Sequence, residues 1–138
     1  MSWVLSAICL CTVFSTSAFA DNSYIIGGVA PAYEYADNPT NELKISSQTA
    51  YCTSKTESNA VSITIEQTLE KHSGWFWIWD DIDDASWSKT VNRSTISFSN
   101  TKSGLDSGTY RLKSVFTLTA LSGKTETVTI YSAEKTVP

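Results

Sequence analysis

Tryptophan, a side chain suited to stacking on sugar rings or anchoring a partner, is concentrated in one part of this 138-residue sequence. If the run Trp75-Phe76-Trp77-Ile78-Trp79 is a strand, its three indoles share one face and Phe76 and Ile78 share the other. Outward-facing indoles would form a platform for a glycan or a protein, whereas an inward-facing indole would fill a core. We expect at least one of the three in the core. The candidate ligand-binding residues are Trp75, Trp77, Trp79 and Trp87.

Groups that could carry catalysis are few. His72 is the single histidine, and the sequence has no G-x-S-x-G, H-E-x-x-H or glycine-rich phosphate motif. One histidine is too few for most histidine-based zinc sites, and nothing around it supports a catalytic triad. A pair of aspartates could serve glycoside hydrolysis only inside a cleft, which a chain this small hardly provides. The sequence therefore predicts a protein that is not an enzyme and that has no cofactor.

The stretch Asp80-Asp81-Ile82-Asp83-Asp84 offers oxygen ligands that calcium could use. It contains no glycine for a tight turn, however, and Ile82 stands in its middle, so it does not match an EF-hand loop. We expect instead a solvated turn that ends the tryptophan-rich strand and keeps it from pairing at its edge. No metal site is predicted.

The first 20 residues read as a secretory signal peptide. They hold no Asp, Glu, Lys or Arg, and Ala18-Phe19-Ala20 has the small-x-small form that signal peptidases cut. The apolar run is too short for a membrane span, so we expect no span after cleavage and an extracellular protein. Cys9 and Cys11 would leave with the signal. Cys52 would then have no internal partner.

Cys52 is expected to be a small buried hydrophobe, with an intermolecular disulfide or a reactive thiol as alternatives. The net charge of −4 lies entirely in the mature part. It disfavours nucleic acid and anionic membranes, because both are bound through clustered Lys and Arg. The remaining candidate partners are a protein or a glycan at the cell surface.

The elements that must position these residues are strands. From Tyr110 to Ala120 the sequence alternates, with Tyr110, Leu112, Phe116, Leu118 and Ala120 on one face, as in a half-buried strand. It begins with a D-x-G-x-Y turn, Asp106 to Tyr110, which resembles the turn into strand F of immunoglobulin-type sandwiches. In those domains the tyrosine hydroxyl bonds to the backbone just upstream.

Further strands are predicted from β-branched content and alternation. Leu43–Thr53 is expected as one strand of ambiguous facing, because Leu43 and Ile45 suggest one inner face and Ala50 and Cys52 the other. In the next strand, Val61, Ile63 and Ile65 are expected to point inward, and in the last one Val128 and Ile130. Turns are expected at 54–59, 72–74 and 121–124. The expected strands are 43–53, 60–71, 75–79, 86–91, 95–99, 110–120 and 126–132.

Several short motifs resemble an uncharacterised family of small secreted β-sandwich proteins from Gram-positive, clostridia-like bacteria. They include Ile45-Ser46-Ser47, Val61-Ser62-Ile63-Thr64-Ile65, Trp87-Ser88-Lys89 and Glu126-Thr127-Val128-Thr129-Ile130, within residues 43–135. The run of tryptophans and the acidic stretch depart from that pattern. The resemblance implies a secreted single-domain sandwich and carries no activity or catalytic residues with it.

The sequence predicts an all-β, antiparallel two-sheet sandwich of about seven strands, immunoglobulin-like or fibronectin-like. Residues 1–20 are the signal peptide, 21–41 a flexible arm and 42–138 the sandwich. The expected function is a secreted non-catalytic module, structural or partner-binding. The alternative is a carbohydrate- or cell-wall-binding domain that uses the tryptophans, and self-association through an open edge or Cys52 is a further possibility.

Overall fold

The computed structural model describes residues 20–21 and 33–138, and within them the chain is strands and turns without a helix. No described segment is a helix long and apolar enough to cross a membrane. Most of the predicted signal peptide and residues 22–32 of the predicted arm lie outside the described residues. The strands are β1 (Ala20–Asp21), β2 (Ala36–Ser46), β3 (Thr49–Ser58), β4 (Ser62–His72), β5 (Trp79–Val91), β6 (Thr95–Lys102), β7 (Gly108–Thr119), β8 (Thr125–Tyr131) and β9 (Lys135–Val137).

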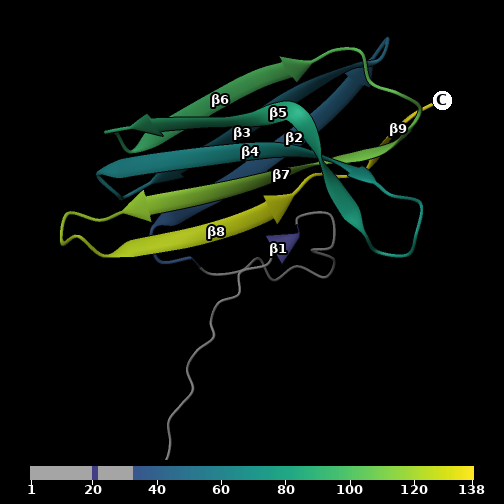
Figure 1. Cartoon of the computed structure of the whole chain (residues 1–138). Helices are drawn as coiled ribbons and strands as arrows, with labels where there is room; N and C mark the ends of the chain where they lie inside the picture. The colour runs from purple at the N-terminus through teal and green to yellow at the C-terminus, as the bar shows by residue number, and fades with distance from the viewer. Residues whose placement is uncertain (1–19, 22–32) are drawn as a thin grey trace, which may run out of the picture.

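Two sheets pack face to face as a sandwich (Figure 1). One has the order β2-β3-β6, and the other has the order β8-β7-β4-β5, with β9 pairing against the start of β7. The seven long strands pair antiparallel, which confirms the predicted immunoglobulin-like or fibronectin-like sandwich. Among the described strands only β1 pairs in parallel, and this places Ala20 and Asp21 beside Ile130 and Tyr131 of β8.

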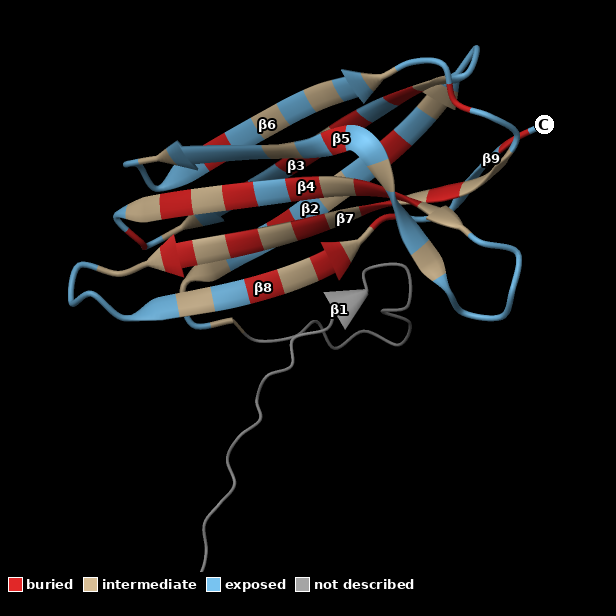
Figure 2. Cartoon of the chain, in the orientation of Figure 1, coloured by how far each residue is buried: buried red, intermediate tan, exposed pale blue. Residues whose placement is uncertain are grey.

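Strand β7 confirms the alternation expected from its sequence. Tyr110, Leu112, Ser114, Phe116 and Leu118 are buried, and the residues that alternate with them are half exposed, which appears as bands in Figure 2. The Tyr110 hydroxyl donates a 2.7 Å hydrogen bond to the carbonyl oxygen of Asp106. This is the tyrosine corner that the D-x-G-x-Y turn indicated. It fixes the loop before β7 to the strand itself.

The prediction of a single strand over 43–53 was wrong, because a hairpin turn divides that segment. Ser47 and Gln48 both have positive φ, 51° and 64°, as the two central residues of a type I′ turn do. Leu43 therefore pairs with Cys52, and Ile45 with Ala50. Before the turn the inward-facing residues have odd numbers, as Ile45 does, and after it they have even numbers, as Ala50 does. This switch marks the two-residue turn in the sequence, because the alternation starts anew after a turn.

Three smaller expectations were also wrong. The turn expected at 54–59 is mostly the second half of β3. Val61 is exposed, because it precedes β4 at the end of the sandwich, whereas Ile63 and Ile65 are buried as expected. Residues 36–41 of the predicted arm belong to β2, and both carboxylate oxygens of Glu126 accept hydrogen bonds from backbone N–H groups of Glu34, Tyr35 and Ala36.

The core consists of two apolar clusters with polar side chains between them. Along β4, Ile63 and Ile65 belong to one cluster and Leu69 to the other, with Gln67 between them. Along β7, Ser114 separates Leu112 from Phe116 in the same way. We call this set the polar layer. Its members are Asn41, Ser54, Gln67, Asn100 and Ser114.

Hydrogen bonds across the two sheets join the polar layer. The Gln67 amide donates to Ser54 Oγ at 2.7 Å and to the carbonyl of Phe98 at 3.1 Å, and its oxygen accepts from Asn100. Ser54 and Ser114 share a 2.7 Å bond between their hydroxyls. Such bonding offsets most of the desolvation cost of burying these groups.

Candidate functional site

The tryptophan-rich run is the tip of the β4–β5 hairpin and not a strand, contrary to the prediction for 75–79. His72 pairs with Trp79 as the last pair of the ladder, so residues 73–78 form the connection. The hairpin tip extends at one end of the sandwich (Figure 1). Trp75, Phe76, Trp77 and Ile78 are 65%, 70%, 87% and 49% exposed. We call these four residues the apolar tip.

Local hydrogen bonds hold the apolar tip in one shape. The Ser73 N–H donates to the Ile78 carbonyl at 3.0 Å, and the Ile78 N–H donates to the Trp75 carbonyl at 3.3 Å. Gly74 and Phe76 both have positive φ, which reverses the chain direction. Gly74 tolerates this without a Cβ, and open space surrounds it. The bend directs the side chains away from both sheets, so neither face of the run is buried.

His72 braces the tip from the end of β4. Its Nδ1 accepts a hydrogen bond from the Gly74 N–H at 3.1 Å, so the proton lies on Nε2, which donates to the Phe76 carbonyl. The imidazole also stands edge-on to Trp79, with ring centroids 5.1 Å apart. Both ring nitrogens therefore serve the loop structure.

The base of the hairpin is a stack centred on Arg111. Its guanidinium lies 4.2 Å from the Trp79 ring centroid and 4.1 Å from that of Tyr131. Its Nε contacts Glu70 Oε2 at 2.6 Å, which neutralises a carboxylate that is almost fully buried. Trp79 is thus half-buried in a cation–π stack and supports the tip from below. The sequence analysis did not identify Arg111, because its partners come from β4, β5 and β8.

Beside the tip, β5 carries the acidic residues that were expected to end a strand. They lie inside β5 instead, where four residues, Ile82 to Ala85, stand opposite Leu69 alone. The chain can accommodate this bulge because Asp84 adopts a positive φ of 57° and Ala85 is buried. Four aspartates remain exposed, and we call them the acidic flank: Asp80, Asp81, Asp83 and Asp84.

The described part of the chain contains no group of three or more His, Cys, Asp and Glu side chains placed to hold a metal ion. Its ion pairs are Lys44–Glu42 and Arg111–Glu70, so the acidic flank is in no described ion pair. The flank is therefore a set of exposed carboxylates in no described ion pair, next to the exposed apolar tip.

The four candidate tryptophans do not form one surface. Trp75 and Trp77 belong to the tip, Trp79 to its base, and Trp87 packs against the core cluster that contains Cys52 and Leu112. The predicted short strand 86–91, which holds Trp87, is the second half of β5. The sequence analysis did not single out Phe76 and Ile78 as exposed binding residues. Their exposure depends on the bend at Gly74.

Cys52 is buried and free, as expected. Burial raises the pKa of the Cys52 thiol from 9.0 to about 12. The thiol therefore stays protonated at neutral pH, and a protonated thiol is a poor nucleophile.

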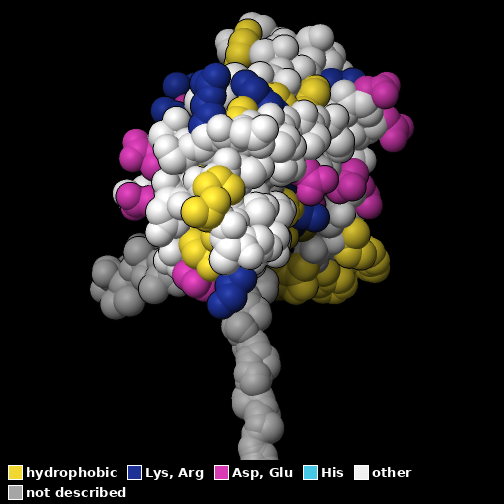
Figure 3. Space-filling model, turned by 90° about the vertical axis from the view of Figure 1, so that its left-hand side faces the viewer, with side chains coloured by type: hydrophobic (Ala, Val, Ile, Leu, Met, Phe, Trp, Pro, Cys, Tyr) yellow, Lys and Arg dark blue, Asp and Glu magenta, His cyan; other side chains and the backbone are white. Residues whose placement is uncertain are grey.

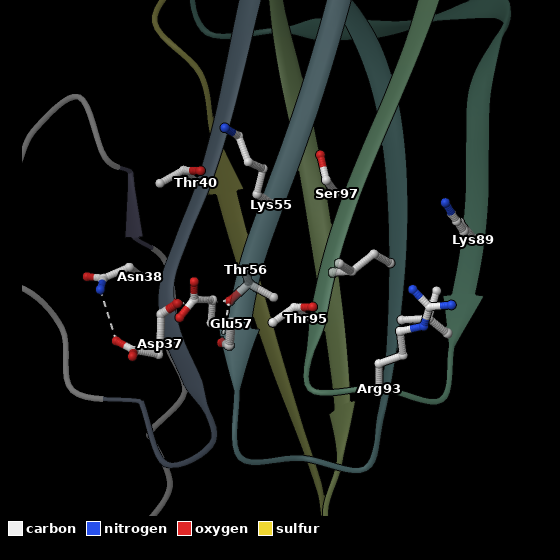
Figure 4. Close-up of a pocket in the computed structure, with 12 residues that line it drawn as sticks. Asp37, Asn38, Thr40, Lys55, Thr56, Glu57, Lys89, Arg93, Thr95 and Ser97 are labelled. Atoms are coloured by element: carbon white, nitrogen blue, oxygen red, sulfur yellow. Dashed lines mark hydrogen bonds between the residues drawn. The ribbon is translucent and has the colours of Figure 1, made fainter.

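A shallow groove of about 540 Å³ lies at the other end of the sandwich, and we call it the end groove (Figure 4). Lys89 and Arg93 lie on one side of it, and Asp37 and Glu57 lie on the other. Val91 and Ile96 contribute apolar surface. Strands β2, β3, β5 and β6 all line this groove, so no local sequence motif could have indicated it.

No family model and no curated protein matches this chain. The crystal structure of wild-type OgpA from Akkermansia muciniphila is similar over 77% of this chain and 31% of that one, with 12% identity and a TM-score of 0.45. The CARDB domain of a Pyrococcus furiosus protein, in complex with di-metal ions, is similar over 76% of this chain and 95% of that one, with 12% identity and a TM-score of 0.38. Similarities this low carry no argument about function. The resemblance to a clostridia-like secreted family stays a prediction.

Proposed function

We propose that this chain is a secreted, non-catalytic β-sandwich module that binds a partner at the cell exterior through the apolar tip. The observation that carries the proposal is the exposure of four consecutive apolar side chains on a hairpin tip braced by His72. Exposed apolar side chains gain free energy when a partner covers them. Aromatic residues are also the commonest anchors at the centres of protein interfaces.

A protein pocket fits the tip better than a flat sugar surface does. The Trp75 and Phe76 rings are tilted by 46° with their centroids 5.1 Å apart, so they offer no common plane for a sugar ring. Trp79 and Trp87 lie too far into the fold to extend a platform. A pocket that receives the side chains separately requires no common plane. The carbohydrate- or cell-wall-binding alternative rests on Trp75 and Trp77 alone.

Binding can be tested without knowing the partner. The mature protein would be passed over four surfaces: an immobilised copy of itself, a washed cell-envelope fraction, a glycan panel and neutral lipid vesicles. Trp75→Ser/Trp77→Ser should lower retention on at least one surface by about 30-fold or more, the effect of truncating one interface anchor. Leu121→Ser is the matched control, since Leu121 is an exposed apolar residue in the turn of another hairpin.

The proposal fails if none of the four surfaces retains the wild-type protein, or if the double variant is retained as well as the wild type. Loss of retention on the glycan panel alone would favour the carbohydrate-binding alternative. Loss on the immobilised copy or on the envelope fraction after its glycans are removed would favour a protein partner.

A further inference from the structure

The two ends of the sandwich carry complementary surfaces. At one end, the apolar tip is bordered by the acidic flank, and none of its four aspartates is in a described ion pair. At the other end, the end groove has Lys89 and Arg93 on one side, and Lys55 also lines it (Figure 4). These three cations are likewise in no described ion pair.

Lys and Arg side chains are concentrated in the end groove, which is unusual for an acidic chain. Only 10 of its 138 residues are Lys or Arg, and three of these line this one groove. Figure 3 views this end of the molecule and shows Lys and Arg side chains gathered on its upper part. Lys89 lies over the Phe98 ring, 5.8 Å from its centroid, which holds its stem against the sheet.

The groove also offers somewhere for an aromatic side chain to pack. Val91 is half-buried, whereas Ile96 is only 6% exposed and belongs to the core, and the lining also includes the polar residues Thr40, Thr95 and Ser97. The shallow groove has a volume of about 540 Å³, which leaves room for an aromatic side chain of the tip. Asp37 and Glu57 lie on the side away from Lys89 and Arg93 (Figure 4). The acidic flank would therefore meet the cationic side.

The tip and the groove of one molecule cannot meet. Strand β5 begins at Trp79, beside the tip, and ends at Val91, in the groove. Thirteen residues of strand span roughly 40 Å, reduced by the bulge. Contact between the two surfaces therefore has to join two molecules. Because the two surfaces differ, the contact is heterologous, and repeating it gives a ring or an open chain.

We infer that the apolar tip of one copy docks into the end groove of a second copy, so that this protein assembles head to tail. This inference rests on the proposed binding role of the tip and names its partner. Trp75 or Trp77 packs against Val91 at the base of the next copy's groove, while the acidic flank faces that copy's Lys89 and Arg93. The groove then supplies an apolar contact for the tip and cations for the acidic flank.

The expected association is weak and sensitive to salt. Even if all three aromatic side chains of the tip were covered, they would bury roughly 150–250 Å² each, which is less than the ~800 Å² per partner of a standard specific interface. We therefore expect a dissociation constant of about 10–100 µM. Exposed charges are screened by salt, so raising the ionic strength to about 1 M should weaken the association.

Complementation between two variants tests the inference in sedimentation velocity experiments. Trp75→Ser/Trp77→Ser removes the tip and keeps the groove, and Lys89→Glu/Arg93→Glu removes the cations of the groove and keeps the tip. The wild type should form dimers and larger species as its concentration rises. Each variant alone should stay monomeric. An equimolar mixture should form a dimer and nothing larger, because only one intact tip and one intact groove can meet.

Lys124→Glu is the control for the charge reversal, because it changes an exposed cation in the β7–β8 turn, outside the groove. It should associate like the wild type. A wild type that stays monomeric at all concentrations, or a variant mixture that stays monomeric, would overturn head-to-tail assembly. If the tip still governs retention on the envelope fraction or the glycan panel, the proposed function stands with another partner. If the tip matters on none of the four surfaces, both proposals fail.

Discussion

The polar layer and the apolar tip depart from the usual division of a protein into apolar interior and polar surface in opposite ways. In the polar layer, buried and half-buried side chains of five strands bond to one another, as Ser54 and Gln67 do at 2.7 Å. In the apolar tip, four consecutive apolar side chains are 49% to 87% exposed. The fold pairs most polar atoms of the first group, with Asn41 Oδ1 left without a partner among the described residues, and it leaves the second group exposed. Polar side chains that are paired inside the sandwich indicate how the two sheets are held together. Apolar side chains that stay exposed indicate a surface for a partner outside the chain.

The largest expected effect comes from opening the polar layer. Gln67→Ala leaves a cavity and removes the partners of Ser54 and Asn100, so we expect the free energy of unfolding to fall by about 3–5 kcal/mol. Urea denaturation followed by tryptophan fluorescence measures the change. Glu66→Ala, an exposed neighbour on the same strand, should cost less than about 0.5 kcal/mol. Equal effects of the two substitutions would contradict the stabilising role of the layer.

A disulfide bond between the two sheets can supply part of the cross-sheet linkage that the polar layer provides. Strands β3 and β7 run parallel across the sandwich, and Ser54 faces Ser114, so Cys52 and Leu112 form the next facing pair along both strands. Leu112 also stands two residues after the corner tyrosine, where antibody domains carry a disulfide cysteine. We expect Leu112→Cys to form a disulfide with Cys52.

The oxidised Leu112→Cys variant should be more stable than its reduced form by about 2–4 kcal/mol. Intact mass and thiol titration report whether the bond forms, and urea denaturation with and without reductant reports the stabilisation. If both thiols remain titratable in the folded variant under oxidising conditions, Cys52 and Leu112 do not face each other.

Burial of the Cys52 thiol is expected to have an intermediate, pH-dependent effect on the free energy of unfolding. The pKa of Cys52 is raised by burial to about 12 in the folded chain. The unfolded chain therefore loses this proton first, and the contribution to stability is complete below pH 9 and is lost as the pH rises toward 12. The wild type should lose up to about 1.4 kcal/mol per pH unit in this window relative to Cys52→Ala. Parallel alkaline slopes for the two proteins would show that the thiol is not protected.

The smallest expected effect on stability comes from the apolar tip. Trp75→Ser/Trp77→Ser removes exposed side chains, so we expect the free energy of unfolding to change by less than about 0.5 kcal/mol. Fluorescence of the variant should lose the fraction that acrylamide quenches most strongly, because Trp79 and Trp87 are more buried. A loss of more than about 2 kcal/mol would mean that the tip packs against its own fold, and the contrast with the polar layer would disappear.

Much of the sandwich could be predicted because its signals are local. Alternation along β7 and β8 identifies their inner faces, since a strand repeats every two residues whatever surrounds it. Residues 106–110 were enough to predict the hydrogen bond from Tyr110 to Asp106. The β2–β3 hairpin also has a local signal in the sequence, because the inward-facing positions switch from odd to even numbers between Ile45 and Ala50. It was missed because Ser47-Gln48 lacks the glycine typical of such a turn.

The sequence by itself determined which segments alternate, and thereby the all-β class, the facing of β7 and β8 and the burial of Cys52. Only the tertiary structure decided that Trp75 to Ile78 stay exposed, that Arg111 stacks between Trp79 and Tyr131, and that the end groove forms. The physical reason is that backbone periodicity is a property of neighbouring residues. Exposure and the gathering of charges depend on which distant strands come together and on where the covering sheet ends.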